Sequence, residues 1–472
     1  MTLTIFDTLR GRLIPFKPID EGKVGIYVCG PTVYDLPHIG HARTLIIFDM
    51  IARYLTYRGY QINYIVNITD IDDKIITRAR ESHLVPKDLA RKFERIFLED
   101  MKTLKATLVD AYPRVSDNIP EIIKIILSLI EKGYAYQIDG DVYFDVTTSS
   151  SLGKLSNQSL DDVWAGARVK VDERKRNPAD FALWKSSKKD EPFWESPFGN
   201  GRPGWHIECS AISMKYLGEQ FDIHGGGRDL IFPHHENEIA QSEAHTGRIP
   251  VVRHWLHTGF LTIDGAKMSK SLGNFITVRD LLKEYDVNAF RLFITSTHYR
   301  SPIDYSEKGL KQSSRSLKRV FEALDNLRQG ILMGDQGRED DKAKRVTAEV
   351  KFIHQRFLKA MDTDFNTPEA SSEFFRLIKL GNQAFSMKAN TVLLQSIYDL
   401  IIELGGVFGL ELERTHELTD EEKRLIAERD LARKNKEWKK ADEIRQKLKE
   451  TGIILKDYPR GTLWTVERKE KT

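Results

Sequence analysis

The chain has 472 residues, of which 40% are hydrophobic and 30% are charged, and its formal net charge is +3. This composition is typical of a folded protein with two to four domains and excludes a largely disordered chain. The small excess of base does not by itself indicate a nucleic-acid partner, because the distribution of charge decides that. Two cysteines exclude a disulfide framework and favour a reducing compartment.

Nothing in the sequence predicts a membrane partner. The N-terminus, MTLTIFDTLRGR, has no apolar signal core. The most apolar run, residues 122–130, contains Lys124 and is far too short to span a bilayer. We therefore expect a cytoplasmic, enzyme-sized protein.

The first predicted elements form a strand–helix–strand unit. GKVGIYVCG (22–30) and QINYIVNIT (61–69) have the apolar, β-branched character of strands, and residues 44–59 between them have the pattern of a helix that ends at Gly59. Such a unit implies a parallel sheet with its ligand crevice at the carboxyl ends of the strands. We therefore expect Cys29, and the loop that follows it, at the crevice.

The rest of the chain changes character several times. Residues 86–135 have a helical pattern, and residues 136–205 mix short strand-like pieces with polar residues, as an insertion would. The α/β pattern then returns as a helix (WHIECSAISMKYLG), a strand with a turn (QFDIHGGG), a helix (PHHENEIAQSEAHTG) and a further strand-like segment. Residues 278–410 predict a helical bundle, 411–450 predict charged helices, and the tail predicts a β-hairpin.

FPHHENEIAQ (232–241) contains two histidines and two glutamates. His234 and Glu238 are four residues apart on the predicted helix and share a face, whereas we expect His235 and Glu236 to point elsewhere. Together with Cys29 and Cys209, this pair would complete a tetrahedral zinc site. Spacing alone does not decide between that site and an ordinary His–Glu pair beside two buried cysteines, because the chain has no C-x₂-C motif.

Two further motifs have the chemistry of phosphate binding. LPHIGHART (36–44) places His38 and His41 around Gly40 where a helix begins, and backbone N–H groups and the helix dipole favour anions there. DGAKMSKSLGN (264–274) carries Lys267 and Lys270 in a glycine-flanked loop that is able to follow a leaving pyrophosphate. Each motif alone is weak evidence for a phosphate site, but the two motifs together, in this order, are a specific signal.

With these motifs the chain resembles the class I aminoacyl-tRNA synthetases, and most closely the cysteinyl-tRNA synthetases. YVCGPTVYD, NITDIDDKI, GRPGWHIECSA, FDIHGGGRDLIFPHHENEIAQ and KMSKSLGNF carry the closer resemblance. The resemblance implies an α/β fold: a Rossmann-type parallel-sheet catalytic domain with a connective insertion, then a helical bundle and a small C-terminal anticodon-binding domain. The implied boundaries are 1–135 and 206–277 for the catalytic halves, 136–205 for the insertion, 278–410 for the stem and bundle, and 411–472 for the anticodon domain.

The resemblance also implies a reaction. The enzyme would activate L-cysteine with Mg-ATP to cysteinyl-adenylate, release pyrophosphate, and transfer cysteine to the terminal adenosine of tRNA(Cys). One zinc ion, held by Cys29, Cys209, His234 and Glu238, would bind the substrate thiolate. Shape alone separates close isosteres by about 10²-fold, so a metal–sulfur bond would explain how serine is rejected without an editing domain. A monomer is the family expectation.

The resemblance assigns roles to further residues. His38 and His41 would stabilise the phosphates, and Lys267 and Lys270 would accompany the pyrophosphate. The expected nucleotide contacts also include Gly40 and the glycines at 225–227, namely Gly225, Gly226 and Gly227, for which a plain turn is the alternative. Trp205 would line the cysteine pocket unless it packs in the core.

DIDDK (70–74) lacks the glycine of a calcium loop, since the sixth position is Ile75, and predicts a helix start with capping acids.

The resemblance places anticodon recognition in the C-terminal region, with help from groups such as Trp464.

Three other functions remain open at this stage. A ligase that couples activated cysteine to an amino sugar would share the motifs, but it would lack the C-terminal region present here. An inactive RNA-binding paralogue would not need the intact His38, His41, Lys267, Lys270 and four metal-ligand candidates. A metal-free nucleotidyltransferase would not need Cys209, His234 or Glu238.

Overall fold

The structure, a computed structural model, describes residues 2–157, 173–268, 275–334, 341–413, 418–458 and 461–466. The chain divides into two compact units. The first unit comprises Met1–Leu281, Thr297–Ser306 and Met361–Thr367, and the second comprises Leu282–Ser296, Glu307–Ala360 and Pro368–Thr472.

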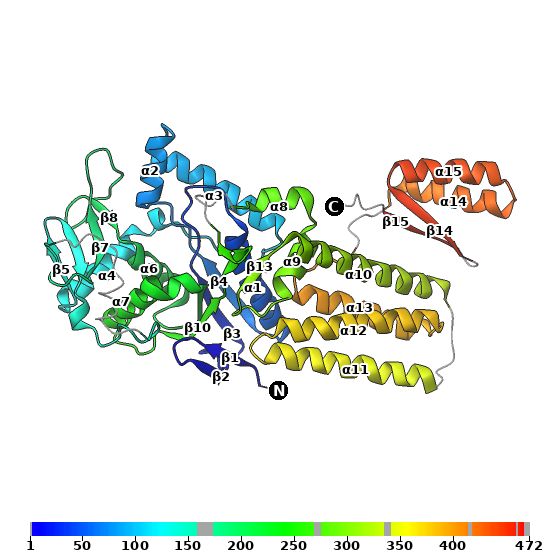
Figure 1. Cartoon of the computed structure of the whole chain (residues 1–472), viewed down its shortest axis with the longest axis horizontal. Coiled ribbons are helices and arrows are strands. Elements are labelled where there is room, and N and C mark those ends of the chain that lie inside the picture. The colour runs from blue at the N-terminus through cyan, green and yellow to red at the C-terminus, as the bar shows by residue number, and fades with distance from the viewer. Residues whose placement is uncertain are drawn as a thin grey trace. The chain divides into compact units, whose positions relative to one another are not determined.

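A four-stranded parallel sheet organises the first unit, and its strand order is β10-β9-β3-β4 (Figure 1). The strands are β3 (Lys23–Val28), β4 (Gln61–Val66), β9 (Phe221–Gly227) and β10 (Val252–Thr258). Helix α1 (Ile39–Tyr57) connects β3 to β4 and buries 13 of its 19 residues. This arrangement confirms the predicted βαβ unit and parallel sheet, and it places Cys29 directly after β3.

Two details of the prediction are wrong. Helix α1 begins at Ile39, five residues before the expected start, because the His38 side chain caps it. Gly225–Gly227 do not form a turn but continue β9, where they pair with residues 256–258 of β10. The glycines are needed for packing: a Cβ on Gly225 would lie 2.0 Å from the Phe48 ring of α1.

The insertion forms an antiparallel sheet, and its order is β5-β6-β7-β8. Its strands are β5 (Ala135–Ile138), β6 (Asp141–Phe144), β7 (Phe181–Ser186) and β8 (Gly201–Pro203). It shares one hydrophobic core with α4 (Ile119–Glu131), α6 (Trp205–Leu217) and α7 (Glu236–Thr246). The insertion is thereby fixed against the helices that carry Cys209 and Glu238.

Smaller elements complete the first unit. They are β1 (Thr4–Asp7), β2 (Arg12–Pro15), α2 (Asp73–Glu81), α3 (Pro86–Thr103), β11 (Leu261–Ile263), β12 (Ala266–Lys267), β13 (Ile303–Tyr305) and the first half of α8 (Val278–Glu284). Strand β11 pairs with β12 on one side and with β13 on the other. Asp72 caps α2 by accepting from Lys74 N, which confirms the predicted helix start.

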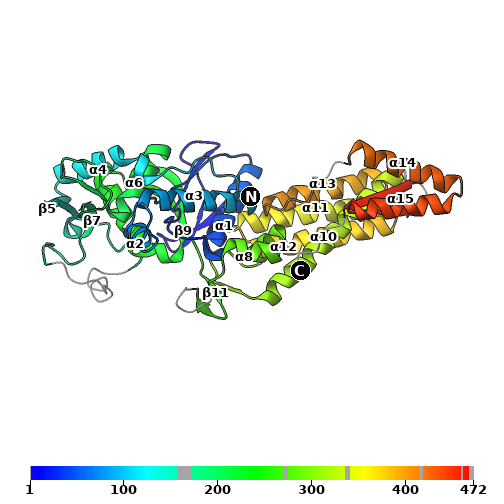
Figure 2. The same cartoon turned by 90° about the horizontal axis from the view of Figure 1, so that it is seen from above.

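The second unit is helical, as predicted. Its helices include α9 (Val287–Thr295), α10 (Glu307–Met333), α11 (Asp341–Asp362), α12 (Thr367–Ser386) and α13 (Thr391–Val407), and α10 to α13 run alongside one another (Figures 1 and 2). Gly330 lets α10 and α13 approach closely, because a Cβ there would lie 2.6 Å from Leu394. None of the helices in the described parts of the chain combines the length and hydrophobicity that a bilayer crossing requires.

The C-terminal part of the second unit has a hydrophobic core of its own. Helices α14 (Asp420–Lys434) and α15 (Trp438–Glu450) pack on the hairpin of β14 (Ile453–Tyr458) and β15 (Gly461–Val466). This core contains Ile444, Leu448, Ile453 and Leu455, and Trp464 packs against it. The hairpin prediction is thus confirmed.

Candidate active site and metal centre

The structure brings the four predicted metal ligands together. Each of Cys29, Cys209, His234 and Glu238 offers one donor atom, and these atoms all lie within 4.8 Å of one another. Cys29 follows β3, Cys209 lies on α6, and Glu238 lies on α7. His234 lies in the irregular turn before α7. Three segments that are far apart in the sequence therefore meet at the carboxyl edge of the parallel sheet.

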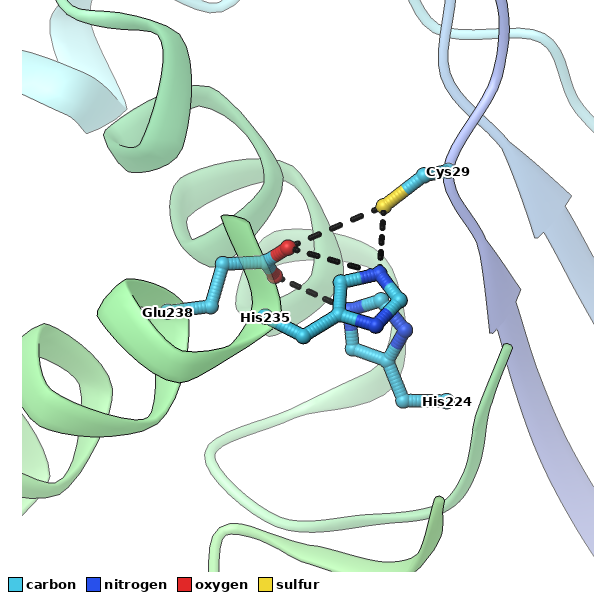
Figure 3. A group of neighbouring side chains, drawn as sticks. All are labelled: Cys29, His224, His235 and Glu238. Carbon is cyan, nitrogen blue, oxygen red and sulfur yellow. Dashed lines mark hydrogen bonds and ion pairs between the residues drawn. The ribbon is translucent and has the colours of Figure 1, made fainter. Parts of the chain in front are cut away.

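A second group of possible ligands overlaps the first. Cys29 and Glu238 also lie within 4.8 Å of donor atoms of His224 and His235, and Figure 3 shows these four side chains converging. His235 Nε2 is 3.2 Å from Cys29 Sγ. The expectation that His235 points elsewhere is therefore wrong. Positions i and i+3 of a helix share a face just as i and i+4 do, so both histidines reach Glu238.

The geometry of the predicted quartet fits a zinc ion. Zinc bonds of about 2.0–2.3 Å in a tetrahedron place the ligand atoms about 3.3–3.8 Å apart. Cys29 Sγ is 3.7 Å from both Cys209 Sγ and Glu238 Oε1, which lies within this range. His234 Nε2 and the same Glu238 oxygen are closer together, at 3.0 Å, the distance of an ion pair. Two sulfurs, one imidazole and one carboxylate are donors that zinc accepts. The residues present therefore fit the ion.

Burial and neighbouring charges determine which of these side chains are ionised. Burial works against ionisation of Cys209, but contacts from Cys29 and His234 outweigh it and lower its pKa to about 6. Burial likewise raises the pKa of Glu238, but His224 and His234 outweigh this effect and lower it to about 2. Burial raises the pKa of the Cys29 thiol. Burial lowers the pKa of His234, but Cys209 and Glu238 outweigh this effect and raise it to about 10. At neutral pH, and without a metal, these side chains thus comprise one thiolate, one carboxylate and one imidazolium.

Further side chains hold the candidate ligands in place. His224 Nε2 is 2.9 Å from Glu238 Oε2, which leaves Oε1 to face the other ligands. His206 Nδ1 is 3.0 Å from His234 Nδ1, and His235 Nδ1 is 2.8 Å from His257 Nε2. Sequence reasoning assigned no role in the metal centre to His206, His224, His235 and His257. The available signal was their density, since seven of the chain's 13 histidines lie between residues 206 and 257.

Trp205 lies beside this centre. It begins α6, its ring is 4.3 Å from the His234 ring, and 39% of the residue is exposed. A side chain exposed to this degree is not a core residue, so core packing does not explain it. Whether it lines the cysteine pocket stays a prediction.

His38 and His41 lie at the start of α1. His38 Nδ1 accepts from Gly40 N (3.1 Å) and His41 N (3.3 Å), and the two imidazole rings stack at 3.8 Å between centroids. Gly40 is required by this cap, because a Cβ there would lie 2.9 Å from the His38 ring. Burial lowers the pKa of His38 to about 4 and that of His41 to about 3. Both imidazoles are therefore neutral at pH 7.

The two phosphate motifs meet in the structure. Ile39 N donates to Ile276 O (3.1 Å), and Val278 N donates to Pro37 O (3.0 Å). The Phe275 ring lies 5.3 Å from the His38 ring. Lys267 lies on β12, and Lys270 lies outside the described residues. The segment that ends the lysine motif is thus joined to the histidine motif, more than 200 residues away.

Solved structures define the class of this fold. Methionyl-tRNA synthetase of Mycobacterium tuberculosis, in complex with methionyl-adenylate, matches with a TM-score of 0.62 at 16% identity, over 82% of this chain and 89% of that one. A leucyl enzyme (LeuRS) of Agrobacterium radiobacter, in a ternary complex with tRNA, matches with a TM-score of 0.60 at 12% identity, over 96% and 97%. At such identities the likeness shows the fold alone, and it is the fold of the class I aminoacyl-tRNA synthetases.

Sequence comparison narrows the class. The family described as the class I (C) tRNA synthetase catalytic domain matches residues 15–315, the DALR domain matches 356–413, and the cysteinyl-tRNA ligase anticodon binding domain matches 415–464. Cysteine–tRNA ligases of Thermococcus gammatolerans (50% identical; 98% of this chain and 99% of the relative) and Geobacter metallireducens (46%; 99% and 100%) align over nearly their whole length. The chain belongs to the cysteine–tRNA ligase family.

This membership decides among the functions that the sequence left open. The match at 415–464 covers the region that the amino-sugar ligase would lack. The relatives are named as ligases, so an inactive RNA-binding protein is not favoured. The chain is an aminoacyl-tRNA synthetase.

Proposed function

We propose that this enzyme activates cysteine with Mg-ATP in the first unit and transfers it to the 3′-terminal adenosine of tRNA(Cys), and that zinc held by Cys29, Cys209, His234 and Glu238 selects the substrate thiol. The observation that carries the proposal is the convergence of these four donors, within 4.8 Å, at the sheet edge that also receives α1. The proposed form is a monomer, and the proposed setting is the cytoplasm, as membership of a family of translation enzymes implies.

The quartet with two cysteines, Cys29, Cys209, His234 and Glu238, is the better candidate for the metal site. It offers two thiol groups, whereas the overlapping group offers one. In addition, His235 and His224 already bond to His257 and Glu238, as side chains that orient ligands do. When bound, zinc supplies a soft Lewis acid that favours a thiolate over a hydroxyl group.

The two histidines of α1 act as neutral hydrogen-bond donors. Since His38 Nδ1 accepts the capping bonds, its proton resides on Nε2, and that N–H is available to a phosphate oxygen. The low pKa values of His38 and His41 exclude a permanent positive charge. Positive charge for the leaving pyrophosphate would come from Lys267 and Lys270. Positioning and charge stabilisation are the main tasks in adenylate formation.

We also propose the five-part domain division, with nucleotide contacts at Gly40 and along Gly225–Gly227, and with Trp205 lining the cysteine pocket. The C-terminal module would recognise the anticodon. Trp464 packs against the core of that module, whereas Trp438 is 57% exposed at the start of α15. Exposed aromatic rings stack on unpaired bases, so Trp438 is the better candidate for an anticodon contact.

The test is a charging assay with purified protein, ATP, magnesium, labelled cysteine and a tRNA with the GCA anticodon. Serine replaces cysteine in the control. Transfer of cysteine and not of serine is the expected result. Cysteine that is adenylated but never reaches tRNA would contradict the transfer step, and no adenylation would contradict the whole proposal.

A further inference from the structure

Arg43 is a buried charge surrounded by backbone carbonyls. It lies on α1 and is 1% exposed. Within the described part of the chain, its guanidinium has no carboxylate partner. Instead it donates to four carbonyls, those of Gly259 (2.7 Å), Phe260, Tyr299 (3.4 Å) and Ser301. Burying a cation without an anionic partner costs free energy. The chain segments that carry the four carbonyls explain why Arg43 is nevertheless buried here.

The four carbonyls belong to two chain segments that cross closely. Residues 259–260 connect β10 to β11, and residues 299–301 lead into β13. A Cβ on Gly259 would lie 2.3 Å from Ser301 O, so only glycine permits this approach. The guanidinium stabilises the carbonyl dipoles that converge at this crossing, and its planar fork can reach several of them at once. Arg43 thereby fixes the base of the β11–β12 hairpin to α1.

This hairpin carries Lys267, while His38 caps α1 and His41 lies in its first turn. The residues after the lysine motif are already joined to the start of α1 by the backbone bonds between Ile39 and Ile276 and between Val278 and Pro37. Arg43 supplies the matching attachment on the other side of the motif. Helix α1 therefore holds the chain both before and after the lysine motif.

We infer that Arg43 is a positioning residue that sets the place of the β11–β12 hairpin, and with it Lys267, relative to His38 and His41 in adenylate formation. It touches neither substrate and acts through the four carbonyls. The inference rests on the proposed function and adds a residue to it. Cysteine binding is not involved, because the candidate metal centre is built from other segments.

Cysteine-dependent ATP–pyrophosphate exchange by the full-length enzyme tests this role. We expect Arg43→Ala to lower kcat by about 10–100-fold, because a small displacement of reacting groups has effects of that size. The KM for cysteine should stay within about twofold of the wild type, since the substitution does not alter the contacts that bind cysteine in the ground state. Millimolar guanidinium should raise the exchange rate of Arg43→Ala several-fold by filling the vacated position.

Arg291 provides the matched control. It is also fully buried, at 0% exposed, and its Nε donates to the carbonyl of Phe408 (2.9 Å) in the second unit. Arg291→Ala should lower the melting temperature but leave kcat for exchange, measured where the protein is folded, within about twofold of the wild type.

Unchanged kcat in folded Arg43→Ala, or an equal change in kcat and in the KM for cysteine, would overturn the inference. If Arg43→Ala does not fold, Arg43→Lys carries the test: lysine cannot form the fork, so wild-type kcat in that variant would overturn it. A wild-type enzyme that shows no exchange with cysteine would instead overturn the proposed function on which the inference rests.

Discussion

Glu238 divides its two oxygens between different neighbours. Oε1 faces His234 at 3.0 Å and Cys29 at 3.7 Å, while Oε2 faces His224 at 2.9 Å. This division assigns His224 to orienting Glu238, whereas both His234 and His235, whose Nε2 is 3.9 Å away, face Oε1. It also provides a way to choose experimentally between the two overlapping quartets.

We expect His234→Ala to lower zinc affinity by more than about 100-fold, and His235→Ala by about 10–100-fold, the range typical of an orienting residue. The measurement is metal content after dialysis against graded chelator, with circular dichroism to confirm folding. The opposite order of effects would assign the metal to the second quartet.

Loss of a side chain that would bind the metal directly should also lower the rate of cysteine activation. Cys209→Ser should lower zinc content and cysteine activation together, because oxygen replaces one of two sulfur donors. Zinc content and ATP–pyrophosphate exchange are measured on the same preparation. Retained metal with normal activation would contradict thiol selection by this centre.

The ionisation of Cys209 gives a pH-dependent signal in zinc-free protein. Its pKa of about 6 means that the thiolate is present above pH 6 and is lost as the pH falls through that value. The raised pKa of Cys29 keeps that thiol protonated over the same range. The chain has only two cysteines, and Cys29 stays protonated in this range. The ultraviolet absorbance of the thiolate should therefore titrate near pH 6 with the amplitude of one thiol group. In Cys209→Ser this step should be absent.

At the scale of elements, the packing of β9 against α1 determines where glycine is required. Gly225 lies against the Phe48 ring, and a Cβ on Gly226 would lie 2.9 Å from His235 and from Leu230. A side chain at position 225 would press on α1, whose first turn carries the histidine motif, whereas one at position 226 would press on His235 and Leu230 before α7. Gly225 therefore keeps α1 near the sheet, independently of the nucleotide contact proposed for it.

Gly225→Ala should lower the free energy of unfolding by about 1–3 kcal/mol, the usual cost of overpacking. Gly406→Ala in α13 is the control: nothing lies within 4 Å of its Cβ, and alanine favours a helix by roughly 0.5–1 kcal/mol. Denaturant unfolding followed by circular dichroism measures both variants. Equal stability of Gly225→Ala and the wild type would mean that Phe48 can move aside.

At the scale of the whole molecule, the candidate catalytic residues and the segment that matches the anticodon binding domain belong to different units. Among the described residues, the contacts given above for the candidate metal centre and for the start of α1 all come from the first unit. The C-terminal module has its own core around Leu448 and Ile453. Amino-acid activation should therefore be separable from tRNA recognition.

Trp438→Ala should weaken tRNA binding by about 1–3 kcal/mol, the value of one stacked base, and leave cysteine-dependent exchange unchanged. The measurement is kcat/KM for tRNA charging beside the exchange rate, with Trp438→Phe as the variant that keeps a stacking ring. Normal charging by Trp438→Ala would remove Trp438 from the anticodon contact.

The sequence by itself determined the order and type of most elements and the four predicted donors. Local patterns were sufficient for this, because glycines, β-branched runs and amphipathic periods act over a few residues. Family motifs supplied the rest of the function, including roles for His38, His41 and Lys267 that the structure does not test. Even the early start of α1 was a local effect, since the capping side chain belongs to the motif itself.

Only the tertiary structure decided which side chains meet. His235 reaches both Cys29 and Glu238, and its contact with Cys29, 206 residues away, depends on how β3 and the segment before α7 pack together. Arg43 finds its four carbonyls more than 200 residues away, and Gly225 is explained only by Phe48 of another element. Contacts between distant segments depend on how the segments pack against one another, and no local pattern contains that information.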